Sequence, residues 1–343
     1  MGPSRVTIID VAKTAGVAVS SASVALNGRP GVSDGTRQRV QAVADSLGFV
    51  PSLRAKSLSS KRAFTIGLVV QRSPDVLESD PFFGALIGGI ETAIDGHDYA
   101  LILQVASDDA DAENHYRRLA ANRRVDGVIL DELRDNDPRI ALVHDLALPA
   151  VAIIPERDTF PLSAVRQSSA PGITELVDHL VALGHTRIAH VSGSPNYVHT
   201  RERIEAWRAA LEAHGLPPGP LIPGDFTTTG GHHAADEILA LADRPTAVVC
   251  ANDLCAVGLM NRLQDKGLTI PKDMSVTGFD GIALGEYVRP ALTTVRSTPA
   301  RVGKTAALLL LDTIRNPTAT HTKTVPPGRM IVRASTGPCP TSR

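Results

Sequence analysis

The chain has 343 residues, of which 43% are hydrophobic and 21% are charged, so it holds enough apolar material for two or three folded units. No apolar run approaches the roughly twenty residues of a membrane-spanning helix, and no apolar signal segment opens the chain. Its three cysteines form no disulfide framework. We therefore expect a globular, non-exported protein of the reducing cytoplasm, with no membrane partner.

The formal net charge of −1 conceals an asymmetry between the two parts of the chain. Residues 1–62 carry nine Lys and Arg against three Asp and Glu, a net charge of +6, whereas the remainder carries −7. A basic head on an acidic body is typical of a protein in which one segment meets phosphates.

Two short amphipathic helices are predicted between Val6 and Asn27, separated by a Gly-Val-Ala turn. Thr7 and Asp10 form a capping box that can start the first helix, and Gly16 ends it. The periodicity turns one small apolar face of each helix inward, and the outward face of the second helix carries Val19, Ser20, Ser23 and Val24. This pattern suits a DNA-binding helix-turn-helix, although periodicity alone is equally compatible with an ordinary helical hairpin.

A third helix is predicted to begin after Ser33 and to end at Gly48, with Arg37 and Arg39 on its outer side. From about residue 64 the chain alternates between apolar strands and amphipathic helices. Strands are expected at 64–70, 99–105, 125–130, 149–154, 187–193, 246–252 and 275–280. Helices are expected at 83–95, 110–123, 173–183, 200–214, 229–241, 253–266 and 300–315.

This alternation predicts an α/β core of two doubly wound parallel sheets, preceded by an all-α head. Ligands of such sheets bind beyond the carboxyl ends of the strands, so a cleft between two lobes is the expected site for a small molecule.

The head sequence VTIIDVAKTAGVAVSSASVALNGRPGVSDGTRQRVQAVADSLGFVPSLRAKSL resembles the DNA-binding head and hinge of the lactose-repressor (LacI/GalR) family of bacterial transcription regulators. The later segments DPFFGALIGGIE, RRVDGVIL, LGHTRIAHVSG, RPTAVVCANDLCAVGLM, SVTGFDG and RPALTTV are similar to the effector-binding core of that family. The resemblance implies a homodimer, or in some members a tetramer, that binds operator DNA through its heads. It also implies a type I periplasmic-binding-protein-like core that binds a small effector.

On this basis we expect a helix-turn-helix domain at 1–50, a hinge at 51–62 and an effector-binding core at 63–340. The first lobe of the core would comprise about 63–165 and 297–323, and the second about 166–296 and 324–340.

The resemblance also assigns candidate DNA contacts. Val19, Ser20 and Val24 match the positions that reach base edges, where valines can touch thymine methyl groups. Arg29, Arg37 and Arg39 are either phosphate contacts or solvated charges. In the hinge, Leu58 matches the leucine that wedges into the minor groove, the alternative being local packing. The full candidate set is Thr7, Val19, Ser20, Ser21, Ser23, Val24, Asn27, Arg29, Arg37, Ala55, Lys56 and Leu58.

Candidate effector contacts follow from the same resemblance. Arg203 matches an arginine that grips effector oxygens, and an arginine opposite a carboxylate suits a sugar or the edge of a purine-like base. Arg203 and Asp253 are alternatively helix caps or bridges, and Phe83 is alternatively a core residue. The candidate set is Phe82, Phe83, Tyr197, His199, Arg203, Phe226, Asn252, Asp253 and Asp280.

Three functions compete for this sequence. A DNA-binding regulator, most simply a repressor, is favoured, with a sugar-like effector ahead of a nucleoside or purine. An enzyme is disfavoured because the chain lacks the dinucleotide, Walker A, HExxH and nucleophile-elbow motifs, and we expect no cofactor and no metal. An exported solute-binding protein would explain the core but not the basic head.

Overall fold

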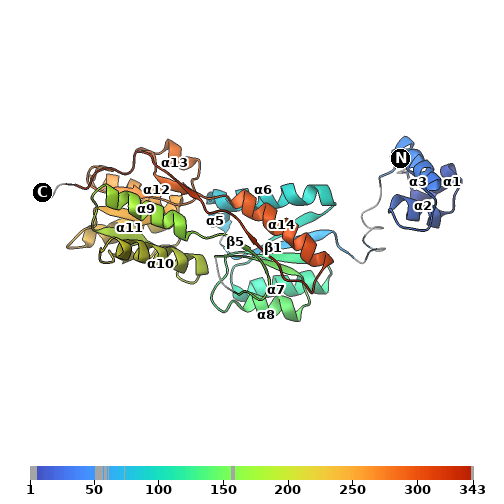
Figure 1. Ribbon diagram of the computed structural model, residues 1–343, viewed down its shortest axis with the longest axis horizontal. Coiled ribbons are helices and arrows are strands. Elements are labelled where there is room, and N and C mark those ends of the chain that lie inside the picture. The colour runs from blue at the N-terminus through green and yellow to red at the C-terminus, as the bar shows by residue number, and fades with distance from the viewer. Residues whose placement is uncertain are drawn as a thin grey trace. The chain divides into compact units, whose positions relative to one another are not determined.

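The computed structural model describes residues 6–50, 57, 60, 62–72, 74–155 and 159–340 (Figure 1). It divides into two compact units, Met1–Ala63 and Phe64–Arg343. The three candidate DNA contacts of the hinge, Ala55, Lys56 and Leu58, lie outside the described residues.

The first unit begins with the helix that the capping box predicts. Helix α1 spans Ile8–Ala15. The Thr7 hydroxyl accepts a hydrogen bond from the Asp10 backbone N–H, while the Asp10 carboxylate accepts from the Thr7 backbone N–H at 2.8 Å. Gly16 ends the helix at φ 64°, a left-handed conformation that glycine adopts without strain. Both ends of α1 are therefore fixed by local interactions that the sequence shows directly.

Two further helices complete the head, α2 at Val19–Leu26 and α3 at Asp34–Ser46. The Ser33 hydroxyl caps α3 by accepting from the Thr36 N–H at 3.3 Å, as predicted. The inward faces form one small core from all three helices, which confirms the predicted packing: Val11, Ala12, Ala15, Ala22, Ala25, Val40 and Ala44.

The second unit opens with a six-stranded parallel sheet in the order β11-β5-β4-β3-β1-β2. Next to the β2 edge, β1 lies between β2 and β3, with Leu68 in register with Leu103 and Ile129. The strands are β1 Thr65–Val70, β2 Ala100–Val105, β3 Gly127–Leu130, β4 Ala150–Ile154, β5 Ser163–Arg166 and β11 Thr322–Thr324. The helices of this lobe are α5 Pro74–Ser79, α6 Pro81–Ile94, η1 Asp95–His97, α7 Asp109–Ala121, α8 Pro138–Asp145 and α14 Pro299–Arg315.

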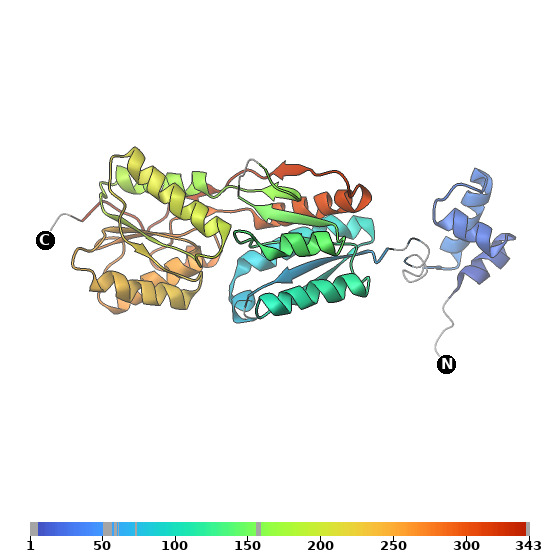
Figure 2. The same ribbon diagram turned by 90° about the horizontal axis from the view of Figure 1, so that it is seen from below.

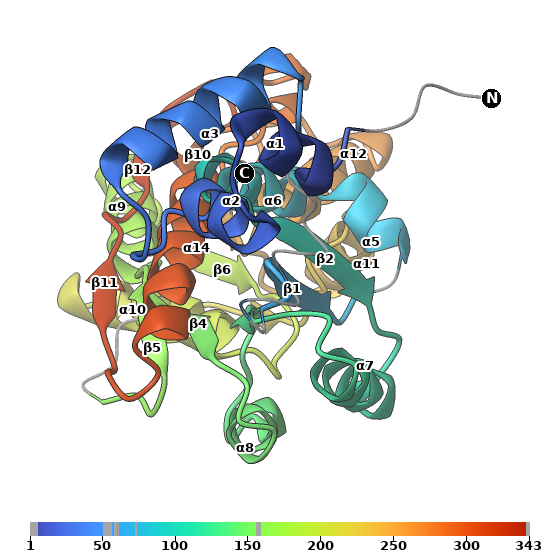
Figure 3. The same ribbon diagram turned by 90° about the vertical axis from the view of Figure 1, so that its right-hand side faces the viewer.

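Figure 3 shows α6 and α14 on one face of this sheet and α7 and α8 on the other. Helix α14 comes late in the chain, yet it packs directly on α6 through glycines. A Cβ atom on Gly303 would lie 2.2 Å from the Leu86 carbonyl oxygen, and one on Gly89 would lie 2.0 Å from the Ala300 carbonyl oxygen. The backbones of α6 and α14 touch because these positions have no side chain.

A second lobe contains a four-stranded parallel sheet in the order β7-β6-β8-β9 (Figures 1 and 2). Its strands are β6 Ile188–Val191, β7 Leu221–Ile222, β8 Ala247–Cys250 and β9 Ser275–Thr277, with an antiparallel pair β10 Thr294–Arg296 and β12 Arg329–Ile331. Its helices are α9 Ala170–Ala182, α10 Val198–Ala213, α11 Thr228–Ala240, α12 Asp253–Asp265 and α13 Leu284–Tyr287. The predicted pair of parallel sheets, each covered by helices on both faces, is confirmed.

Three segments carry the chain between the lobes: β5 to α9, β10 to α14, and β11 to β12. The crossings are bonded together, since the Gln167 amide donates to the Thr298 hydroxyl at 3.2 Å and the Val325 N–H donates to the Arg166 carbonyl at 2.8 Å. The sequence reading missed several short elements here, including β5, β10, β11 and β12.

No single described helix has both the length and the apolar composition needed to cross a membrane; α1 and α2 meet that test only as a pair bent by 103°.

Candidate functional site

The exposed face of α2 is the first candidate site. Val19 is 44% exposed and Ser20 is exposed beside it, so both side chains are open at the start of the helix. Ser21, Ser23 and Val24 are half-buried further along. The outward surface thus holds small side chains only, as the sequence predicts.

The other head candidates are bonded within the head. Thr7 is engaged with Asp10 in the capping box. The Asn27 amide donates to the Ser23 carbonyl at 2.8 Å and so closes the end of α2.

Arg37 lies differently from its expected place on the outside of α3. Its side chain is half-buried, whereas Arg39 is exposed. The guanidinium donates to the Ala25 carbonyl at 3.0 Å and to the Arg29 carbonyl at 2.7 Å. Arg37 therefore holds the last turn of α2 and the loop that follows it, because carbonyls at a helix end have no partner inside the helix.

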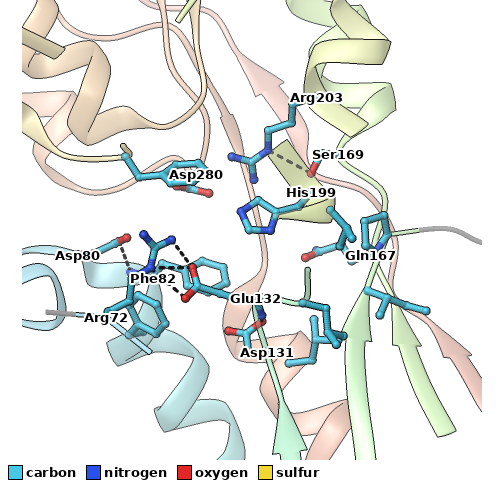
Figure 4. A pocket seen from close by; sticks show the side chains of 17 residues that line it. Arg72, Asp80, Phe82, Asp131, Glu132, Gln167, Ser169, His199, Arg203 and Asp280 are labelled. Carbon is cyan, nitrogen blue, oxygen red and sulfur yellow. Dashed lines mark hydrogen bonds and ion pairs between the residues drawn. The ribbon is translucent and has the colours of Figure 1, made fainter. Parts of the chain in front are cut away.

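The second candidate site is a cavity between the two lobes of the core (Figure 4). It holds about 730 Å³ of empty space when the open solvent at its mouth is counted, and about 100 Å³ of room for water-sized spheres. The first lobe and the crossing segments supply Arg72, Asp80, Phe82, Phe83, Asp131, Glu132, Leu133, Ile153, Ile154, Pro155 and Gln167, and the second supplies Ser169, Val198, His199, Arg203, Phe226 and Asp280.

Arg203 and Asp280 are the charged groups that the second lobe presents to this cavity. The Arg203 guanidinium donates to the Ser169 hydroxyl at 3.3 Å and to the Ala251 carbonyl, and it lies 4.2 Å above the centre of the Phe279 ring. Burial lowers the pKa of Arg203, and the facing Asp280 opposes that effect. Burial also raises the pKa of Asp280 well above its usual range, although Arg203 pulls it down. The two buried side chains interact electrostatically, and both line the cavity.

Aromatic rings form the apolar walls. Phe82 meets Phe83 edge to face at 5.5 Å, and Asp80 caps α6 by accepting from the Phe82 N–H at 3.0 Å. Phe83 belongs both to the core of the first lobe and to the cavity wall, so the two readings of it are compatible. Phe226 adopts a left-handed φ of 70°, and its ring lies so close to Gly193 that a Cβ there would be 1.8 Å from it.

Asn252 and Asp253, two of the predicted effector contacts, are not among the residues that line this cavity. Asn252 caps α12, accepting from the Cys255 N–H at 2.9 Å, and its amide donates to the Phe226 carbonyl at 2.8 Å. Asp253 accepts from the Ile282 N–H at 2.8 Å and from the Thr294 hydroxyl at 2.5 Å. They hold the segments that present Phe226 and Asp280, which agrees with the alternative of a structural role for Asp253.

Tyr197 also lies beside the cavity rather than on its wall. Its ring stacks on His199 at 5.4 Å and 11°, and His199 lies 5.4 Å from the Phe226 ring. Burial lowers the pKa of His199 well below its usual value, and Arg203 and Arg72 add to that effect, so the imidazole is neutral.

Sequence reasoning missed four charged residues on the wall: Arg72, Asp80, Asp131 and Glu132. Arg72 follows β1, and Asp131 and Glu132 follow β3, so the rule that ligands bind beyond the carboxyl ends of parallel strands would have found three of them. Burial, together with the Glu132 charge, raises the pKa of Asp131 to about 7. The buried Asp131 Oδ2 atom has no hydrogen-bond partner within the described part of the chain.

Comparisons with known proteins identify both parts of the chain. A family model described as "Bacterial regulatory proteins, lacI family" matches residues 7–52, and a "Periplasmic binding protein-like domain" matches residues 177–336. The HTH-type transcriptional repressor PurR of Aliivibrio salmonicida is 33% identical over 313 residues, which cover 90% of this chain and 92% of that protein.

Solved structures of regulators are similar over almost the whole chain. The lac repressor dimer bound to operator and the anti-inducer ONPF matches with a TM-score of 0.81 and 27% identity, covering 97% of this chain and 100% of that one. The complex of the transcriptional regulator CelR with cellobiose matches with a TM-score of 0.75 and 28% identity, covering 96% and 100%. The chain therefore belongs to the lacI family of bacterial regulatory proteins and is a DNA-binding transcriptional regulator.

Proposed function

We propose that this regulator represses transcription as a homodimer on a palindromic operator, with an effector in the cleft controlling its affinity for DNA. The observation that carries the proposal is the presence, in one chain, of a helix-turn-helix with an open recognition helix and a cavity lined by two lobes. Two-fold symmetry of the protein would be mirrored in the operator. Such a protein acts in the cytoplasm, at the nucleoid, and needs no catalytic group.

In the proposed complex, α2 enters the major groove. Val19 and Val24 contact thymine methyl groups, Ser20 bonds a base edge or a phosphate, and Arg29 contacts phosphate. Thr7, Ser21, Ser23 and Asn27 are proposed at the edge of the same surface. The hinge residues Ala55, Lys56 and Leu58 contribute minor-groove contacts, with Leu58 as the wedge that bends the DNA.

The charges around the cavity indicate the class of effector. Four carboxyl groups face two guanidinium groups there, and the charge of Arg72 is already taken up by its ion pair with Glu132. An incoming phosphate or carboxylate would have Arg203 as its main cationic partner and would lie among four carboxyl groups, whose ionised forms it would disfavour at low dielectric. Sugar hydroxyl groups, in contrast, can donate to or accept from the carboxyl groups of Asp131 and Asp280 in either protonation state.

We therefore propose a neutral, polyhydroxylated effector of the sugar class. Arg203 and Asp280 bind neighbouring hydroxyl groups, and Asp131 offers its unpartnered oxygen to another. Phe82 and Phe226 pack against the apolar faces of the sugar ring. The cellobiose bound by the similar CelR structure supports this class.

A purine-like base is the second candidate. The rings of Phe82, His199 and Phe226 offer flat surfaces for stacking, and Asp280 can accept a hydrogen bond from a ring or exocyclic N–H.

A thermal-shift panel on the full chain distinguishes these classes. The panel contains ribose, glucose, cellobiose, glucose 6-phosphate, adenosine and guanine, each at the same concentration. A ligand at 100 times its dissociation constant stabilises the folded state by about 2.7 kcal/mol. We expect a neutral sugar to raise the melting temperature and glucose 6-phosphate to leave it unchanged. A shift with the phosphate, or with the purines alone, would contradict the proposed class.

A further inference from the structure

Arg72 and Glu132 form an ion pair that belongs to the first lobe. They follow β1 and β3, which are neighbours in the sheet. The Arg72 Nε atom lies 3.0 Å and 2.9 Å from the two Glu132 carboxylate oxygens, and its Nη2 atom also donates to the carboxylate (Figure 4). The side chains are only 12% and 14% exposed. Although burial lowers the pKa of Arg72, the charge and hydrogen bonds of Glu132 raise it above its usual value, so the guanidinium stays charged.

Rings of the second lobe rest on this guanidinium. The centre of the Tyr197 ring lies 4.7 Å from the Arg72 Cζ atom, and the centre of the Phe226 ring lies 5.4 Å from it. His199 stacks on Tyr197 and meets Phe226, so the three rings form one group, two of which contact the Arg72 cation. Arg72 is thus bonded to its own lobe and attracted to the other.

Further contacts join the same two regions. The Val198 N–H donates to the Leu133 carbonyl at 3.0 Å, and Arg134 pairs with Tyr197 as an isolated β-bridge. Arg201 forms an ion pair with Asp135. The loop after β3 therefore docks on the first turn of α10, and none of these contacts involves the three segments that connect the lobes covalently.

The docked region also walls the effector cavity, since Arg72, Glu132, His199 and Phe226 all line it. Noncovalent contacts can separate while the covalent crossings stay in place, so this is the side on which the cleft can open. We propose that Arg72 controls how often the two lobes separate at the cavity. Glu132 fixes Arg72 to the first lobe, and the contacts of its guanidinium with the Tyr197 and Phe226 rings hold the second lobe against it.

Hydrogen exchange of the full chain, without ligand or DNA, tests the proposal. The reporter is the Val198 amide, which bonds across the two lobes. In Arg72→Met, which keeps an apolar stem but removes the cation, exchange at Val198 should rise about tenfold, while amides of β1 and α14 keep their protection. Arg117→Met is the matched control, because it breaks an ion pair on the same lobe whose side chains are half exposed. Arg117→Met should leave Val198 unchanged.

Tyr197→Leu and the double variant Arg72→Met/Tyr197→Leu complete the experiment. If cation and ring act as one contact, each single change gives a similar acceleration and the double change adds little to either. Unchanged exchange at Val198 in Arg72→Met would overturn the proposal. So would an equal rise in β1 and α14, which indicates general loss of stability, or fully additive effects in the double variant.

The inference rests on the proposed function only in calling the cavity an effector site. Since the exchange experiment contains no sugar and no operator, its failure would not affect the proposed effector class. Failure of the ligand panel would likewise not affect the proposed role of Arg72 in holding the two lobes together.

Discussion

Asp131→Asn should stabilise the folded core by an amount that grows with pH. The folded state holds the Asp131 proton up to a pKa of about 7, chiefly because the carboxyl is buried, whereas the unfolded chain releases it near 3.8. As pH rises between these two values, the unfolded chain releases the proton while the folded state keeps it. The folded state therefore loses stability relative to the unfolded chain over this range. Each pKa unit corresponds to about 1.4 kcal/mol, so the wild-type chain loses about 2–3 kcal/mol from this group between pH 5 and pH 8.

Asparagine has no proton to lose, and it keeps the oxygen that accepts from the Glu132 N–H at 2.8 Å. We expect the difference in unfolding free energy between variant and wild type to increase by about 2 kcal/mol from pH 5 to pH 8. Urea unfolding at the two pH values, followed by circular dichroism, measures it. Asp145→Asn serves as the control because that side chain is 77% exposed on the same lobe. A difference for Asp131→Asn that is equal at both pH values would refute this account of the buried carboxyl.

Four other predictions rest on contacts elsewhere in the head and the core. Arg203→Met should abolish the effector-induced thermal shift while operator binding persists in a gel-shift assay; a normal shift would remove Arg203 from the site. Asp253→Ala should lower the unfolding free energy by about 3 kcal/mol, because it leaves buried donors unpaired; a loss below about 1 kcal/mol in urea unfolding would contradict that role. Gly303→Val should prevent close packing of α14 on α6 and lower the melting temperature by several degrees, measured by calorimetry; an unchanged value would show that the helices can separate freely. Arg37→Met should weaken operator binding with an unchanged salt dependence, whereas loss of a phosphate contact would reduce the salt slope by about one.

Local interactions made much of the fold predictable. The capping box of Thr7 and Asp10, the Gly16 stop and the Ser33 cap are short-range contacts, and each is present in the structure. The long apolar strands and amphipathic helices were likewise readable from their periodicity. Short strands such as β5 and β11 were not, because a few residues carry too little pattern and gain their partners only by tertiary pairing.

The candidate effector site was likewise predictable only in part from the sequence. Arg203 and Asp280 stand in recognisable motifs, and both line the cavity. Asn252 and Asp253 stand in an equally recognisable motif, yet their polar atoms are used to hold the chain behind the wall. The Arg72–Glu132 pair joins residues 60 positions apart, so only the folded sheet brings them together.

Control of DNA binding through the cleft is tested most directly by titrating a fluorescent operator fragment, selected from genomic DNA, with and without the sugar that shifts the melting temperature. We predict that this sugar changes operator affinity in the wild-type chain, while Arg203→Met binds the operator equally well in its presence and absence. An affinity that the sugar does not change in the wild type, or that it changes to the same degree in Arg203→Met, would contradict the account.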